Sequence, residues 1–114
     1  MNLSILTLSI VAGAALASAR FVTQAGVYPA AGAAAIGVTR TSAGAAGDLV
    51  PVDVLGTAIA EAGAAFAKDV PLMLDATGRV IAWTTTNKAV GRSMAAAGAA
   101  GDMVEVLLQV GAGN

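Results

Sequence analysis

The chain has 114 residues, a mean hydropathy of +0.79 and a formal net charge of −1, with six Lys or Arg against seven Asp or Glu. This length suits one domain with one hydrophobic core, and the sparse, balanced charge offers no basic patch, so no nucleic-acid partner is expected. The sequence contains neither cysteine nor histidine, which excludes disulfides, thiolate chemistry, and the commonest general base and transition-metal ligand.

The N-terminal stretch allows two interpretations. Residues 3–19 carry no charge and end in Ala17-Ser18-Ala19, a pattern typical of signal-peptide cleavage. However, no Lys or Arg precedes the stretch, polar residues interrupt it, and it is too short and too polar for a membrane span. The sequence favours a segment of the folded domain with no membrane partner. The alternative is an exported surface or adhesion β domain with a cleaved signal, whose mature chain would begin near Arg20.

The N-terminal part of the chain predicts a series of short strands. Alternation in residues 5–10 places Leu6, Leu8 and Ile10 on one face of a strand. The following residues, 11–19, are expected to be extended or irregular. Further strands are expected at residues 20–23, 27–28, 34–40 and 49–54, with turns at 24–26 and 43–48. Within them, Gly37 is expected at a kink, and Pro51 at a sheet edge or a bulge.

The C-terminal part predicts the same kind of structure. A short strand at residues 57–60 precedes a hairpin, in which residues 70–74 and 79–83 flank a turn at 75–78. Residues 89–93 repeat the glycine-interrupted strand, with Gly91 as its kink. Residues 103–110 form the closing strand. Short strands separated by regular turn signals indicate a compact all-β barrel or sandwich.

An internal repeat organises these elements. Residues 35–54 recur at 89–108 with a shift of 54, residues 12–17 recur at 62–67 with a shift of 50, and Gly26 matches Gly78 at a shift of 52. The changes in shift fall in loops, where insertions are tolerated. Two copies are too few for a solenoid. The sequence therefore predicts one domain, residues 1–114, built from two pseudo-symmetric halves: half one, residues 3–54, and half two, residues 55–110.

The carboxylates are the first candidates for chemistry. Asp48 and Asp102 occupy equivalent turns and could form a symmetric cation site, but Asp at such positions more often binds its own turn backbone. Asp75 is likewise explained by turn chemistry. A small hydrolase or sugar-binding barrel that uses these three aspartates is a third hypothesis. No catalytic residue, cofactor or metal site emerges, so we expect a protein that is not an enzyme. Trp83 is expected in the core or as an interface anchor.

The segment VPLMLDATGRVIAWTTTNKAVG, residues 70–91, resembles the corresponding part of lambda-type head decoration proteins, which are capsid cement proteins of tailed bacteriophages. Segments such as ARFVTQAG and AAIGVTRTSA extend the resemblance over nearly the whole chain. The resemblance implies a compact, tulip-like β domain that forms homotrimers on the outer surface of the virion. There it binds the major capsid protein, cements neighbouring subunits and stabilises the DNA-filled head. It also implies synthesis in the host cytoplasm.

The N-terminus departs from the lambda-type pattern, in which a polar arm precedes the barrel. Here the apolar pattern begins at Leu3 and leaves almost no arm. If the N-terminus contacts the capsid, residues 1–10 are therefore expected to add a strand to a neighbouring sheet. The residues expected at an interface with the capsid or with another subunit are Met1, Leu3, Ile5, Leu6, Leu8 and Trp83.

Overall fold

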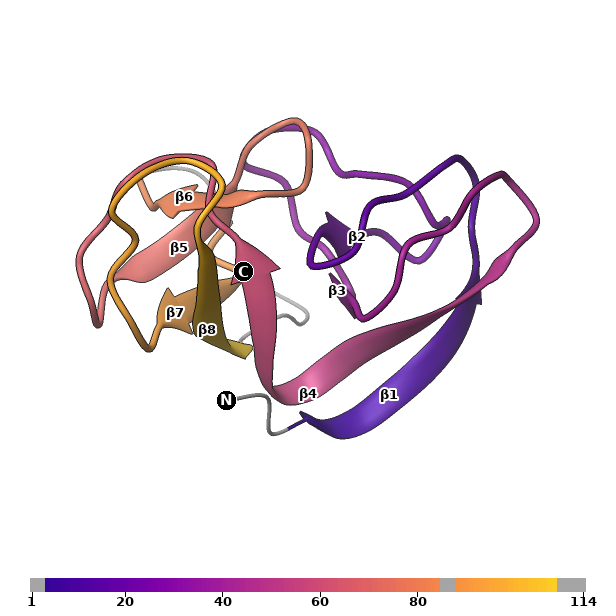
Figure 1. The fold of residues 1–114 in the computed structure, drawn as a ribbon, viewed down its shortest axis with the longest axis horizontal. Coiled ribbons are helices and arrows are strands. Elements are labelled where there is room, and N and C mark those ends of the chain that lie inside the picture. The colour runs from indigo at the N-terminus through magenta and orange to yellow at the C-terminus, as the bar shows by residue number, and fades with distance from the viewer. Residues whose placement is uncertain (1–3, 85–87, 109–114) are drawn as a thin grey trace.

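The computed structural model describes residues 4–84 and 88–108 and contains eight strands in that part of the chain (Figure 1). The strands are β1 (Ser4–Val11), β2 (Phe21–Val22), β3 (Gly37–Thr39), β4 (Leu49–Glu61), β5 (Pro71–Leu74), β6 (Val80–Ala82), β7 (Gly91–Ser93) and β8 (Met103–Leu108). They form an antiparallel sheet in the order β2-β3-β4-β8-β7-β5-β6, with β1 joined to β4. The predicted all-β small barrel is confirmed. The described residues include no helix long and apolar enough to cross a membrane.

Strand β4 is the longest element and runs through both halves of the repeat. Its first part lies between β1 and β3, whereas its last part pairs with β8. The prediction of two separate strands, 49–54 and 57–60, is therefore wrong. Gly56, with a φ of 97°, lies where the partner changes and adopts a conformation that few other residues tolerate. Figure 1 shows β4 leaving the long ribbon that it forms with β1 and turning towards β8.

Pro51 does not mark an edge or a bulge, contrary to the sequence prediction. Its strand is paired with both β1 and β3, and Pro51 itself lies opposite Ser9 of β1. The register shifts between β1 and β4 lie away from Pro51, on either side of Leu6. The ladder with β3 ends at the pair Thr39–Val52, and the next contact is a hydrogen bond from Arg40 N to Pro51 O of 2.9 Å. Because the ladder ends beside Pro51, its missing N–H costs no strand–strand hydrogen bond.

The two halves share their strand register. The pairs from Thr7–Asp53 to Val11–Leu49 between β1 and β4 correspond residue by residue to the pairs between β4 and β8, from Thr57–Leu107 to Glu61–Met103. Likewise, the β2–β3 pair Phe21–Val38 corresponds to the β5–β7 pair Pro71–Arg92. The last part of β4 is thus the counterpart of β1, and β8 is the counterpart of the first part of β4.

The predicted turns at Gly26 and Gly78 have the same geometry. In each, the glycine N–H donates to the carbonyl three residues before it, Thr23 or Asp75. The φ angles are 78° at Gly26 and 79° at Gly78, in the left-handed region that glycine adopts without strain. The repeat shift is 52 residues at these turns, against 50 before them and 54 after them, yet the geometry of the turn is the same in both halves.

Several strands are shorter than predicted. β3 and β7 begin at Gly37 and Gly91, so these glycines start strands and do not interrupt them. A Cβ at Gly91 would lie 2.7 Å from Leu107 O, which indicates close approach of the neighbouring backbone as the reason for glycine. Residues 27–28 form no strand, and residues 12–20 are irregular apart from a bridge between Leu16 and Ala43. The predicted end of the closing strand, Val110, lies outside the described residues.

The N-terminal stretch belongs to the folded core. Ile10, Ala12 and Leu16 are buried in one hydrophobic cluster with side chains of half one, including Val50 and Val52. Cleavage near Ala19 would remove these residues together with β1. The second cluster contains the core of half two.

Candidate functional site

The aspartates Asp48 and Asp102 stabilise their own turns, which confirms the turn interpretation. Asp102 Oδ2 accepts hydrogen bonds from Gly98 N at 2.8 Å and Ala99 N at 3.3 Å. Asp48 Oδ2 makes the same two contacts in half one, at 3.1 and 3.2 Å. Among residues 4–84 and 88–108, no three acidic side chains come together as a metal site.

Asp75 also acts in its own turn. Its Oδ1 accepts hydrogen bonds from Thr77 N, Thr77 Oγ1 and Arg79 N at 2.7–3.1 Å. Partial burial raises the pKa of the Asp75 carboxyl, but the hydrogen bonds from Thr77 and Arg79 and the charge of Arg79 outweigh it. The pKa of Asp75 therefore lies below its ordinary value, which favours a structural anion over a general acid.

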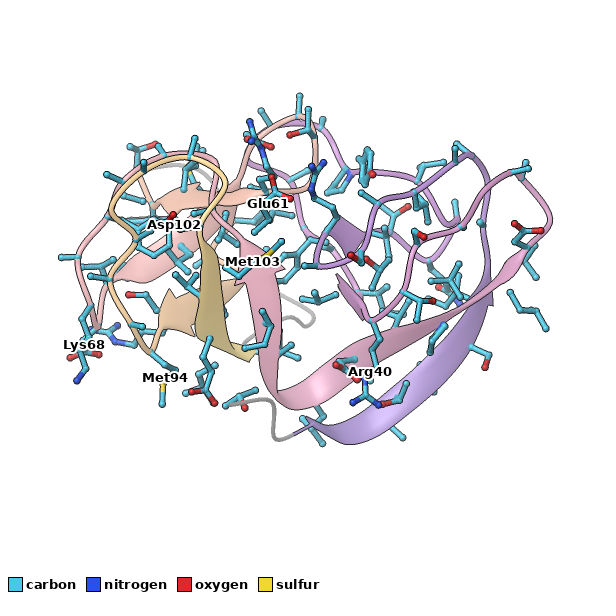
Figure 2. All side chains as sticks on the ribbon, viewed as in Figure 1. Arg40, Glu61, Lys68, Met94, Asp102 and Met103 are labelled. Carbon is cyan, nitrogen blue, oxygen red and sulfur yellow. The ribbon has the colours of Figure 1, made fainter. Side chains whose placement is uncertain are left out.

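A group of charged side chains joins the halves. Arg20, from half one, binds Glu61 Oε1 through Nε and Nη2, each at 3.2 Å, and donates from Nη1 to Thr77 O at 3.0 Å. Glu61 Oε2 lies 3.4 Å from Arg79 Nη1. These opposite charges pair with one another at the junction, which favours a structural role for the cluster. Glu61 is labelled in Figure 2.

The ribbon of β1 and the first part of β4 carries the most prominent exposed apolar residues. Leu6 pairs with Leu55 and Val11 with Leu49, and all four are exposed; Leu49 reaches 70%. Between these pairs, Asp53 is buried and accepts a hydrogen bond from Thr7 Oγ1 at 2.7 Å. Among the described strands, β1 pairs only with β4, so its outer edge has no strand neighbour.

An apolar hollow of about 430 Å³ opens beside this ribbon. Leu8 belongs to β1 and Val54 to β4, whereas Ile36 directly precedes β3. The hollow, as the term is used below, is lined by Leu8, Thr23, Gln24, Ala34, Ala35, Ile36 and Val54. It resembles small-molecule sites in its apolar character, but it contains no charged or titratable side chain that could act on a bound molecule.

Trp83 is 37% exposed and follows the last residue of β6. Its backbone N–H donates to Pro71 O at 3.0 Å, which fixes the residue alongside β5. An exposed tryptophan on a strand edge is typical of an interface anchor. Of the two interpretations drawn from the sequence, the interface anchor fits this exposure better than the core.

The structure brings only part of the predicted interface set into view. Leu6, Leu8 and Trp83 are exposed, whereas Met1, Leu3 and the side chain of Ile5 lie outside the described residues. Sequence reasoning missed several exposed apolar side chains: Val11, Leu49, Leu55, Met94, Met103 and Leu107. Both methionines belong to half two: Met103 is the first residue of β8, and Met94 follows β7 (Figure 2). Leu49 and Met103 follow the two turn aspartates, and this shared repeat position was a usable signal.

Comparisons with known proteins agree with this picture of a β domain that has exposed apolar surface and no reactive cluster in its described part. No curated protein matches the sequence. The N base of head fiber gp8.5 of bacteriophage phi29 has a similar fold, with a TM-score of 0.73 and 15% sequence identity over 91% of this chain and 93% of that one. The family model described as phage cement protein matches residues 2–108. The chain belongs to the phage cement protein family and is a structural phage protein.

Proposed function

We propose that this protein binds the outer surface of a phage capsid and cements neighbouring major capsid subunits, thereby stabilising the DNA-filled head. Membership of the phage cement family supports this function, and the similarity in fold to a phage head fiber protein is consistent with it. Residues 1–114 act as a single decoration domain without catalysis. The protein is made in the host cytoplasm and resides on the virion surface.

The observation that carries the proposal is the unprotected edge of β1. Soluble proteins normally protect an edge strand with charge, proline or a covering segment. β1 has the sequence SILTLSIV, with neither charge nor proline, and its ribbon with β4 exposes Leu6, Val11, Leu49 and Leu55. Such an edge is suited to pair with an extended strand of another protein. We assign this surface to the major capsid protein and include Met1, Leu3 and Ile5 in the proposal, because they precede or belong to β1 in the sequence.

Multivalency explains how a small surface fastens a shell. A single ribbon contact is modest, but the several identical contacts of a homotrimer gain avidity when they bind together. A trimer that holds several capsid subunits opposes their separation under internal pressure. No catalytic group is needed for this role.

The test is decoration of shells of the matching phage that lack this protein. Purified wild-type protein is expected to co-sediment with the shells to a fixed, saturable copy number. Leu49→Glu is expected to lower the affinity at least about tenfold, because it places a charge in an apolar contact. The matched control is Met103→Glu, which changes the counterpart position in half two and is expected to bind as the wild type does. Absence of uptake by the wild type would overturn the proposal.

A further inference from the structure

Half one caps the core of half two. Phe21 and Val38 from half one are buried in the hydrophobic cluster of half two, together with Val106 and Leu108. Backbone hydrogen bonds of 2.8–2.9 Å accompany this contact, from Phe21 N to Gly78 O, Gly32 N to Leu74 O, Lys88 N to Gly32 O and Glu61 N to Ala19 O. The paired residues Phe21 and Val38 are called the capping row below.

The matching end of half one is open. The three largest apolar residues of the hollow have counterparts in half two at the same repeat positions: Ala58 for Leu8, Val90 for Ile36 and Leu108 for Val54. Those counterparts are buried in the cluster that contains the capping row. Leu8 is 39% exposed, whereas Ala58 is 0% exposed. The hollow is therefore the repeat equivalent of a site that another half covers.

The counterpart of the capping row is also at the surface. Pro71 pairs with Arg92 in the same register as Phe21 with Val38. Trp83 lies beside Pro71, held by the hydrogen bond from its N–H, and the chain contains no other tryptophan. Half two therefore presents Trp83, Pro71 and Arg92 where half one presents the capping row.

We infer that Trp83 and its neighbours on one copy of this chain dock into the hollow of a second copy, head to tail. The second copy is the occupant because its half two would cover half one of the next copy as half one covers half two within the chain. Aromatic anchors in apolar pockets dominate protein interfaces, and Thr23 and Gln24 supply a polar rim. A head-to-tail contact forms a closed ring when the rotation permits. Because this contact presupposes the proposed homotrimer, three copies would complete the ring.

Sedimentation velocity on two variants tests the contact. Trp83→Ala removes the anchor and Leu8→Glu charges the hollow, and each is expected to weaken self-association about 30-fold or more and yield monomers. Mixed together, they are expected to form a one-to-one heterodimer, because Leu8→Glu retains Trp83 and Trp83→Ala retains the hollow. Leu49→Glu, outside the contact, is the control and is expected to assemble as the wild type does. Trp83 fluorescence is expected to shift to shorter wavelength on assembly, but not in Leu8→Glu.

Three results would overturn this inference: wild-type protein that stays monomeric, single variants that assemble normally, or a mixture of the variants that stays monomeric. Circular dichroism on each variant separates loss of contact from loss of folding. Shell binding distinguishes this failure from that of the proposed function. Monomers that decorate shells to saturation reject the head-to-tail contact alone, whereas assembled protein that leaves shells bare rejects the capsid function.

Discussion

Half one and half two have the same strand register but differ in what covers them. Thr39 and Ser93 make equivalent hydrogen bonds, and Asp48 and Asp102 stabilise equivalent turns. Yet the core of half two is closed by half one, whereas half one ends in an open hollow and in a β1 edge that pairs with no other described strand. Duplication of this β unit has therefore repeated its backbone contacts, while the divergent side chains decide which surfaces remain available for partners.

We expect the greatest loss of stability from changes at the turn glycines. A Cβ at Gly78 would lie 2.6 Å from Phe21 O, and one at Gly26 would lie 2.7 Å from Gly13 N, both at positive φ. Gly26→Ala and Gly78→Ala are each expected to lower the free energy of unfolding by roughly 3 kcal/mol, through overpacking and left-handed strain. Urea denaturation measures the loss.

The control for this pair is Gly101→Ala, at a φ of 95°, where an added Cβ would have no other atom within 4 Å. It is expected to cost about 1 kcal/mol, because strain acts there without a clash. Because Phe21 and Val38 of half one belong to the core of half two, we expect the halves to unfold as one cooperative unit. Two separate unfolding transitions in either turn variant would contradict this expectation.

The buried hydroxyl groups of Thr39 and Ser93 test whether equivalent hydrogen bonds in the two halves contribute equally to the free energy of unfolding. Thr39 Oγ1 accepts from Arg20 N at 3.1 Å and donates to Ala17 O at 2.8 Å, and Ser93 Oγ makes the same contacts with Val70 N and Ala67 O at 2.9 and 2.8 Å. Thr39→Val and Ser93→Ala are each expected to cost about 1–2 kcal/mol in the free energy of unfolding, since backbone groups lose partners.

Thermal unfolding measures the loss of stability in Thr39→Val and Ser93→Ala. Thr39→Ser and Ser93→Thr retain the hydroxyl and serve as controls, with losses expected to be clearly smaller. A loss from Thr39→Val that is no larger than the loss from Thr39→Ser would contradict the expectation that the hydroxyl contributes more than the methyl group.

The charged side chains at the junction test the contact between the two halves, which has no counterpart at the equivalent repeat position. Glu61 binds Arg20 and Arg79, whereas its counterpart in half one, Val11, is apolar. Glu61→Gln is expected to lower the free energy of unfolding by about 1 kcal/mol, and the difference from wild type should shrink at high salt because the pairs are partly exposed. Asp69→Asn, which removes the exposed pair with Arg92, is the control and should have almost no effect. A loss independent of salt would argue against an ionic role for Glu61.

The pH dependence at Asp75 is expected to be weaker than any of these effects. Its folded pKa lies below the ordinary value of 3.8, so its stabilising contribution is present above that value and is lost as pH falls through the folded pKa. Its counterpart in half one, Thr23, does not titrate in this range. Asp75→Asn is therefore expected to reduce the fall in urea midpoint between pH 5 and pH 3, whereas Thr23→Ser leaves it unchanged. An identical pH profile for Asp75→Asn would refute this assignment.

Much of the fold could be predicted from local sequence. Alternating residues around Val50 and Val104, the Gly-Asp turns and the hairpin around Asp75 depend on contacts between near neighbours, and each appears where expected. Strand ends and strand partners could not be predicted in this way. The continuity of β4 through Gly56 depends on partners that are far apart in the sequence, β1 and β8.

The candidate surfaces likewise include residues that local sequence could predict and residues that it could not. The apolar pattern that begins at Leu3 marked Leu6 and Leu8 as interface candidates, because such a pattern can be recognised in local sequence. Leu49 and Val11 were missed, because their exposure depends on which face of the ribbon the rest of the chain covers. The hollow was also missed, since it exists only where half one lacks the cover that half two receives.

The amino-acid sequence alone established an all-β chain with a twofold repeat, turn aspartates and a surface poor in charge, because these features follow from composition, period and short-range hydrogen bonding. The three-dimensional structure was needed to show that Phe21 and Val38 belong to the core of half two and that the outer edge of β1 has no strand neighbour in the described chain. Burial and strand pairing join residues distant in sequence, and an internal sequence repeat does not specify which copy covers the other.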